Sequence, residues 1–182
     1  MQFDHYGGQA ARLAADLVNT PAEHFTPGRL APVLSAHGVV ERTLSDLQAE
    51  SLLAWSRQLE ECFGTQDAEQ RCQRVNALLR RSASTPRIAL HDGNPHLHYD
   101  SAEADAAAHV RAMTAAGLAY IVCSAGPNRL GRCLRAACSV AFVDTSRNGR
   151  RAYCSARCAN NAAVGRHRER GNDRGRTGSS QL

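Results

Sequence analysis

Apolar residues recur at helical spacing through most of the first half of the chain. Between residues 8 and 19, 45 and 59, and 67 and 81, they return every three or four positions, which is the period of one helix face. Three helices that each bury one face are therefore predicted. The apolar residues expected in their shared core are Ala11, Leu13, Ala14, Leu17, Leu52, Leu53, Trp55, Leu59, Val75, Leu78 and Leu79.

Local start and stop signals mark helix ends in the same region. Ser45 followed by Gln48 three residues later matches a capping box, in which each side chain bonds the other residue's backbone amide. Thr26 followed by Pro27 predicts an N-cap with proline at the first helical position. Gly38 is expected to end that additional helix.

The period then changes from helical to alternating. Residues 87–91 and 96–99 alternate in polarity around Gly93 and Asn94, which predicts a β-hairpin. Ser101 is expected to cap a long alanine-rich helix that runs to about Cys123. The core residues predicted for this helix are Val110, Met113, Leu118, Ile121 and Val122.

Charge is distributed unevenly along the chain. All 22 basic residues are arginine, and residues 1–130 carry a net charge of −3 whereas residues 131–182 carry +8. A basic end of this kind is typical of proteins that contact a polyanion. No run of ~18 uninterrupted apolar residues and no signal peptide is visible, so a cytoplasmic location without a membrane partner is expected.

Seven cysteines in a reducing compartment favour metal binding over disulfides. Four of them form two short-spaced pairs separated by fifteen residues, a spacing typical of zinc ribbons and treble clefs. With no spare ligand to leave an open position, the sequence predicts one structural Zn²⁺. The alternative is four unrelated buried cysteines. The predicted ligands are Cys133, Cys138, Cys154 and Cys158.

The spacer between the two cysteine pairs has its own pattern. Residues 140–145 can form a strand, residues 147–150 contain an Asn-Gly turn, and residues 151–153 are expected to return as a second strand. A helix is predicted after Cys158, ending near Arg170. A turn with the first cysteine pair (a knuckle), then a hairpin, then a helix is the order of a treble-clef-like module.

The predicted fold class is therefore α+β. A mostly helical N-terminal domain with one β-hairpin spans residues 1–128, and the small treble-clef-like zinc module spans residues 129–170. Residues 171–182 are polar and rich in glycine, so a disordered tail is expected there.

Two stretches resemble a known family. The run FVDTSRNGRR at residues 142–151, with its flanking cysteines, resembles the CGNR zinc-finger family. The run DLVNT at residues 16–20 is similar to the opening of the ABATE domain, which precedes this finger in the family. The resemblance implies a stress-induced regulator of transcription that binds DNA. One departure is visible, because Ala159 and Asn161 replace the glycine and arginine of the family's name.

Arginines gather around the predicted zinc module. On a rigid module they can neutralise phosphates and release counterions, or contact guanine edges in the major groove. The alternatives are a solvated basic face and, for Arg147, a role in holding the turn through Asp144. The candidate nucleic-acid contacts are Arg147, Arg150, Arg151, Arg157, Arg166, Arg168 and Arg170.

The N-terminal domain carries weaker signals. Several histidines and one aspartate could form a metal or ligand pocket, but histidines on a hairpin's outer face are more often simply exposed. These residues are Asp16, His24, His91, His96 and His98. The sequence contains no phosphate loop, nucleophile elbow or paired-carboxylate motif, so no enzyme is expected.

Two functions remain open from the sequence. The first is a DNA-binding transcription regulator whose N-terminal domain senses an unknown small ligand or forms a homodimer. The second is a zinc-scaffolded module that binds a protein or RNA without sequence-specific DNA binding.

Overall fold

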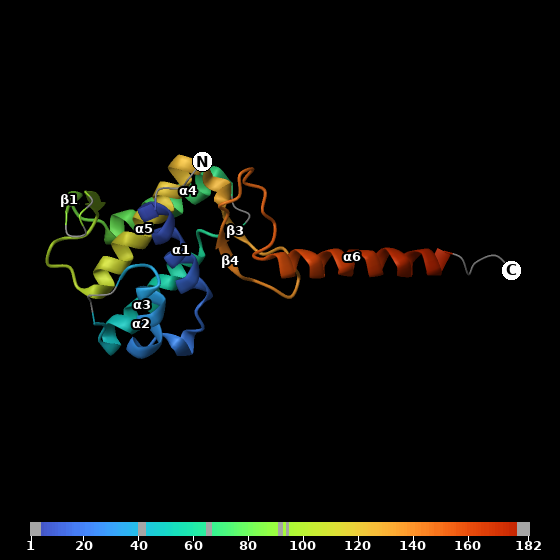
Figure 1. The fold of residues 1–182 in the computed structure, drawn as a ribbon, viewed down its shortest axis with the longest axis horizontal. Helices are drawn as coiled ribbons and strands as arrows, with labels where there is room; N and C mark the ends of the chain where they lie inside the picture. Colours follow the sequence, from blue (N-terminus) through green and yellow to red (C-terminus); the bar gives the residue numbers. More distant parts are fainter. Residues whose placement is uncertain (1–4, 40–42, 65–66, 91–92, 94, 178–182) are drawn as a thin grey trace.

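The computed structural model describes residues 5–39, 43–64, 67–90, 93 and 95–177. The chain is mostly helical, with two small antiparallel sheets of two strands each. The helices form the body of the molecule, and the last helix projects away from it (Figure 1). The elements are α1 (His5–Asn19), η1 (Ala22–His24), α2 (Pro27–Ser35), α3 (Asp46–Glu60), α4 (Ala68–Ser82), β1 (Arg87–Ala89), β2 (His96–His98), α5 (Ala106–Ala125), η2 (Pro127–Arg129), β3 (Leu130–Arg132), β4 (Ala141–Val143) and α6 (Ala156–Thr177).

Helices α1 and α5 form the centre of the helical domain, and α3 and α4 pack against them. The apolar residues predicted for the core all lie in it or pack against it, which confirms that part of the sequence pattern. Gly117 of α5 is placed so close to α1 that an added Cβ would lie 2.6 Å from the backbone nitrogen of Ala11. By length and composition α5 could also cross a membrane, but half of its apolar window is buried, as in the core helix of a bundle.

The local signals for helix ends are largely confirmed. The capping box at Ser45 forms with both of its hydrogen bonds, and Thr26 precedes α2 with Pro27 at its first position. The prediction for α5 was wrong by one turn, because Asp105 caps it instead of Ser101. The Asp105 carboxylate accepts a hydrogen bond from the Ala108 amide at 2.7 Å, and a carboxylate is at least as good an N-cap acceptor as a hydroxyl.

The predicted hairpin is present as β1 and β2, with Ile88 paired to Leu97. Its orientation is unusual, because the apolar face points outward. Ile88 is 74% exposed and Leu97 48% exposed, whereas His98 on the opposite face is buried. The hairpin therefore turns polar side chains toward the body of the molecule. His91 and Asn94 lie outside the described residues.

The second sheet differs from the sequence prediction. β4 pairs with β3, which precedes the first cysteine, and residues 151–153 do not form a return strand. The physical reason is Asp144, whose carboxylate accepts hydrogen bonds from the amides of Ser146 and Arg151. The chain after β4 therefore wraps around this side chain instead of running back along the strand.

The two parts of the chain share one core. Leu130, Ala141 and Val143 of the small sheet belong to the same buried cluster as the helices. The side chain of Asn19, at the end of α1, bonds both the amide and the carbonyl of Ala141, at 2.8 and 2.9 Å. The zinc module is thus attached directly to the end of α1.

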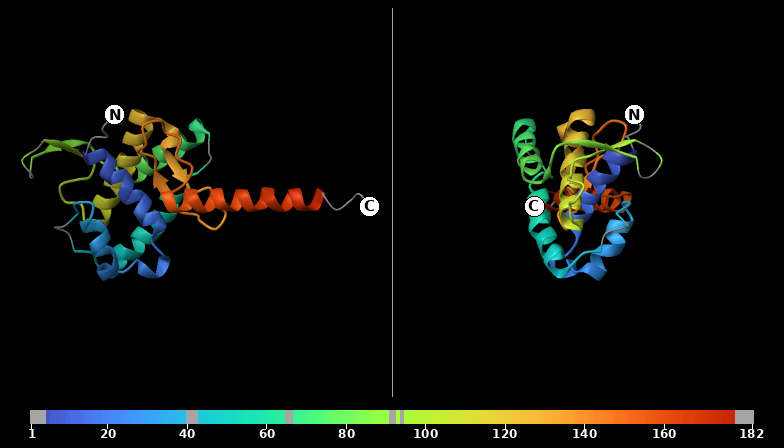
Figure 2. Two further views of the ribbon diagram at one scale, coloured as in Figure 1. Left: turned by 45° about the vertical axis from the view of Figure 1, so that its right-hand side comes forward. Right: turned by 90° about the vertical axis from the view of Figure 1, so that its left-hand side faces the viewer.

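α6 begins beside the zinc module and extends away from the body (Figure 1 and the left view of Figure 2). It continues to Thr177, beyond the predicted end near Arg170. Residues 178–182 lie outside the described chain.

Candidate metal centre and its basic surroundings

The four predicted ligands converge at the junction between the β3–β4 hairpin and α6. One sulfur from each of Cys133, Cys138, Cys154 and Cys158 lies within 4.8 Å of the others. The measured separations are 3.8 Å between Cys138 and Cys154 and 3.6 Å between Cys154 and Cys158. Thiolates bound tetrahedrally at about 2.3 Å from a zinc ion lie roughly 3.8 Å apart. The cluster therefore has the dimensions of a structural zinc site.

The first ligand pair lies in the loop between β3 and β4. The Cys133 amide donates to the Val140 carbonyl at 3.0 Å, which continues the β3–β4 ladder to the first ligand. The Cys138 amide donates to the Arg135 carbonyl at 2.8 Å, which closes a tight turn between the two cysteines. The turn brings the second thiol back toward the first.

The second pair is held by the start of α6. The Ser155 hydroxyl accepts a hydrogen bond from the Cys158 amide at 3.2 Å, the bond that an N-cap side chain makes. Cys158 thereby takes a fixed position in the first turn of the helix, one turn from Cys154. The Leu134 amide donates to the Ala152 carbonyl at 2.9 Å and ties the two halves of the site together.

The thiols are poised to lose protons to a metal. Burial opposes ionisation of Cys133, but hydrogen bonds from the amides of Cys154 and Arg135 and from neighbouring thiols lower its pKa to about 7. Burial and the adjacent thiols raise the pKa of Cys154 to about 12. A bound Zn²⁺ deprotonates coordinating thiols. The four cysteines are consistent with one structural zinc ion.

A buried polar centre supports the loop between the cysteine pairs. Asp144 is 1% exposed, and the Arg129 guanidinium lies 3.9 Å from its carboxylate. Burial alone would raise the pKa of Asp144, but hydrogen bonds from Ser146 and Arg151 and the charge of Arg129 lower it. Arg129 also donates to the Ser146 carbonyl and lies against Gly149, whose φ of 62° is left-handed. Asp144 thus stays ionised and fixes the loop.

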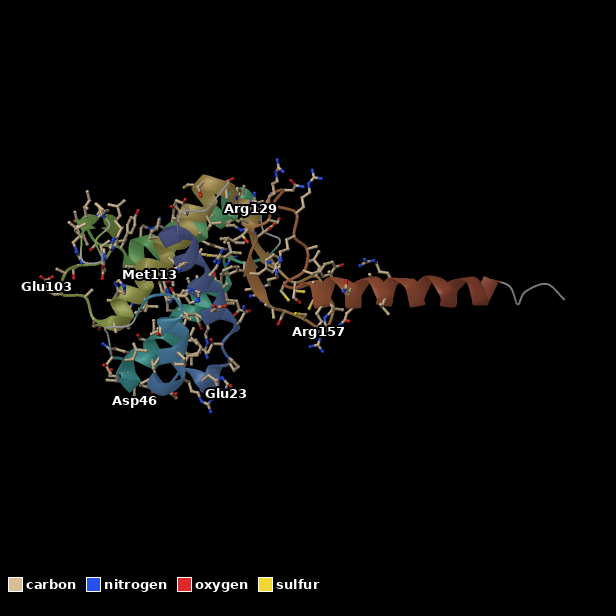
Figure 3. All side chains as sticks on the ribbon, in the orientation of Figure 1. Glu23, Asp46, Glu103, Met113, Arg129 and Arg157 are labelled. Carbon is tan, nitrogen blue, oxygen red and sulfur yellow. The ribbon has the colours of Figure 1, made fainter. Side chains whose placement is uncertain are left out.

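The seven candidate arginines divide into three groups. Arg151 donates to the Tyr153 carbonyl at 2.8 Å, and Arg166 donates to the Tyr153 hydroxyl at 2.8 Å, so both stabilise the module itself. The side chains of Arg168 and Arg170 lie outside the described residues, although both positions are on α6. The three that remain are exposed, and their side chains make no hydrogen bond or ion pair within the described chain: Arg147, Arg150 and Arg157. Figure 3 places Arg157 at the start of α6, close to the cysteine sulfurs.

Two residues of this centre could not be identified from the pattern alone. The sequence suggested Arg147 as the partner of Asp144, but the guanidinium near Asp144 belongs to Arg129, just before β3. Asn19 was visible only as part of the DLVNT run, with no sign that its side chain bonds β4. Both contacts join segments distant in sequence, which local patterns do not reveal.

A second group of metal-binding side chains lies on the helical domain. One ligand atom from each of His98, Asp100 and His109 lies within 4.8 Å of the others. The expectation that the hairpin histidines are exposed is therefore wrong for His98, which is 6% exposed. Asp100 and His109 carried no signal in the sequence, because the group assembles only when β2 meets the start of α5.

Comparison with known proteins bears on the C-terminal part of the chain. No curated protein matched the chain. Residues 129–171 match the family model of the CGNR zinc finger, a region that contains all four cysteines of the cluster.

Proposed function

We propose that this protein is a DNA-binding regulator of transcription whose zinc module contacts DNA through exposed arginines. The observation that carries the proposal is that the side chains of three arginines are exposed and unpaired within the described chain. They are Arg147, Arg150 and Arg157. All three are exposed on a module fixed by the cysteine cluster and by Asp144, and no other described residue neutralises them. Guanidinium groups on a rigid module that have no other partner can contact phosphates without first breaking an existing interaction.

Charge supports the same proposal. The segment 131–182 carries a net charge of +8, and α6 extends part of that charge away from the body. A projecting basic helix beside a compact module can follow a groove of the duplex while the module lies against the backbone. We include a treble-clef-like fold of the zinc module in the proposal, because a cysteine turn between β3 and β4 is followed by the second cysteine pair at the start of α6.

The N-terminal domain has a supporting role in this proposal. Because Asn19 joins α1 directly to β4, a ligand or a second copy that shifts α1 would also shift the zinc module. Such a contact provides a physical route from the helical domain to the DNA-binding face.

The alternative function is a module that binds a protein or RNA. Three apolar side chains exposed on the zinc module and α6 favour it: Leu134 at 63%, Val140 at 38% and Val164 at 50%. An apolar surface of this kind suits a protein partner better than a phosphate backbone.

The test is binding of the full chain to duplex DNA, measured by fluorescence anisotropy over a range of salt concentrations. We expect binding that weakens steeply with salt, and a salt slope that falls by about 3 in the triple variant R147A/R150A/R157A, because each phosphate contact contributes close to 1. Arg29→Ala is the matched control, since Arg29 is also exposed but lies on α2. Its slope should equal that of the wild type.

Two outcomes would contradict the proposal. One is absence of duplex binding at ~100 mM salt. The other is a triple variant with unchanged affinity and slope. Competition with single-stranded RNA, and selection of bound fragments from genomic DNA, separate the DNA-binding regulator from the alternative.

A further inference from the structure

The hairpin β1–β2 buries the face that is normally exposed. His96 and His98 share the inward face of β2, while Ile88 and Leu97 point to solvent. Burial of imidazoles and exposure of aliphatic side chains both cost free energy. The inward polar face therefore needs a compensating interaction, and the hairpin histidines supply one with α5.

The centre of that interaction is a buried carboxylate between two imidazoles. His98 Nδ1 lies 3.1 Å from Asp100 Oδ1, and His109 Nδ1 lies 2.8 Å from Asp100 Oδ2. The Asp100 and His98 side chains are only 3% and 5% exposed, and that of His109 is 14% exposed. Three potential metal ligands from β2, its following loop and α5 thus converge in a site that is largely shielded from water.

We propose that His98, Asp100 and His109 form a binding site for a divalent first-row transition-metal ion, separate from the cysteine cluster. Two imidazole nitrogens and one carboxylate suit Zn²⁺ or Fe²⁺, whereas Ca²⁺ and Mg²⁺ prefer oxygen ligands alone. Ligand atoms around an ion with bonds of about 2.1 Å lie roughly 3.0 to 3.4 Å apart. The observed nitrogen–oxygen distances need to widen by only a few tenths of an ångström.

The surroundings of His98 also fit coordination. A ligating histidine usually donates its second ring N–H to an acceptor, which fixes the ring. His98 Nε2 lies 3.0 Å from His96 Nε2, so His96 can accept that proton when Nδ1 of His98 faces a metal. Burial lowers the pKa of His98, and the neutral ring is the form that binds metal. His96 is thus a positioning residue for the site.

One nearby group opposes a cation. A guanidinium nitrogen of Arg87 lies 3.9 Å from Asp100 Oδ1 and 3.4 Å from His98 Nδ1. The Arg87 side chain is 37% exposed at the edge of the hairpin, so it has room to turn toward water when an ion enters. Three protein ligands leave at least one coordination position open, unlike the closed cysteine cluster.

The two sites lie on opposite sides of the helical body. The hairpin is at the end of the long axis away from α6 in Figure 1, and Figure 2 shows the same separation. In Figure 3, Glu103 marks the loop that leads from β2 toward α5, and Arg157 marks the zinc module. A substitution at one site should therefore leave the ligands of the other in place.

The experiment is titration of the metal-depleted full chain with Zn²⁺, with the bound ions counted after removal of free zinc. We expect two ions per wild-type chain and one per chain of His109→Gln, whose amide can still donate to Asp100. His24→Gln is the matched control, because His24 lies on η1 away from the cluster, and it should retain two ions. In nitrogen-15 NMR, the ring nitrogens of His98 and His109 should change chemical shift when the second equivalent of Zn²⁺ is added.

A wild-type chain that binds one zinc ion, with no histidine ring shift, would overturn the proposal and leave the cluster as a hydrogen-bond network only. Retention of two ions by His109→Gln would place the second ion elsewhere and overturn it as well. If His109→Gln fails to fold, the wild-type ion count and the ring shifts still decide the outcome.

Discussion

Helices α1 and α5 are joined by apolar side chains at van der Waals contact, whereas the zinc module is joined by sulfur, carboxylate and backbone polar groups. At Gly117 the two helices approach so closely that one methyl group has no room. In the zinc module the buried polar centre is Asp144, and the aliphatic side chains of its sheet belong to the helical core. The helical domain is therefore expected to hold its fold without metal, and the module is not.

The largest expected effect is loss of zinc from Cys138→Ser. Zinc binding supplies about 10 to 16 kcal/mol of apparent free energy in small zinc domains, so the module should unfold while α1 to α5 remain helical. Zinc content together with amide NMR of the two regions checks this. Cys123→Ser removes an exposed thiol outside the cluster and should change neither. Cooperative unfolding of both regions would contradict the expectation that the helical domain holds its fold without metal.

The next effect concerns the contact between α1 and α5. In Gly117→Ala the new methyl would lie 2.6 Å from the Ala11 backbone nitrogen, so the helices must separate. Overpacking of this kind costs about 1 to 3 kcal/mol, which thermal or urea unfolding can measure. Gly165→Ala on α6 meets no neighbour within 4 Å and should be neutral or slightly stabilising. Equal stability of the two variants would contradict the close packing.

The third effect is confined to the zinc module and concerns Asp144. The charged Asp144 carboxylate accepts hydrogen bonds from the Ser146 and Arg151 amides. Asp144→Asn removes that charge and should lower the stability of the module by about 1.5 to 3 kcal/mol. Because the folded pKa of Asp144 lies below its ordinary value of 3.8, this stabilisation is fully present at neutral pH and is lost only as the pH falls below that value.

The effect of Asp144→Asn can be measured as the rate of zinc transfer to a chelator at pH 7. We expect the variant to release zinc faster than the wild type, with unchanged helical content. Asp46→Asn, an equal change of charge at an exposed position of α3, should release zinc at the wild-type rate. Unchanged release from Asp144→Asn would mean that zinc alone fixes the loop.

Features that depend on short stretches of chain could be predicted from the sequence. The Ser45 capping box acts within one turn, and the structure contains both of its hydrogen bonds. The cysteine cluster could also be predicted, since two short-spaced pairs bring four thiols together once a single loop closes.

Features that depend on tertiary contact could not. The pairing of β4 with β3 rather than with residues 151–153 depends on Asp144, an internal acceptor that competes with a hairpin. The group of His98, Asp100 and His109 depends on the angle at which β2 approaches α5, and spacing along the chain does not determine that angle.

The bond from Asn19 to Ala141 has one more consequence, for how partners can approach. A strand at the edge of a sheet presents unpaired amides and carbonyls, and these can recruit a strand from another chain. The Asn19 side chain occupies both backbone groups of Ala141 in the way an additional strand would. β4 is thereby blocked against strand addition at this point. Pairing of a second copy along this edge is opposed at Ala141.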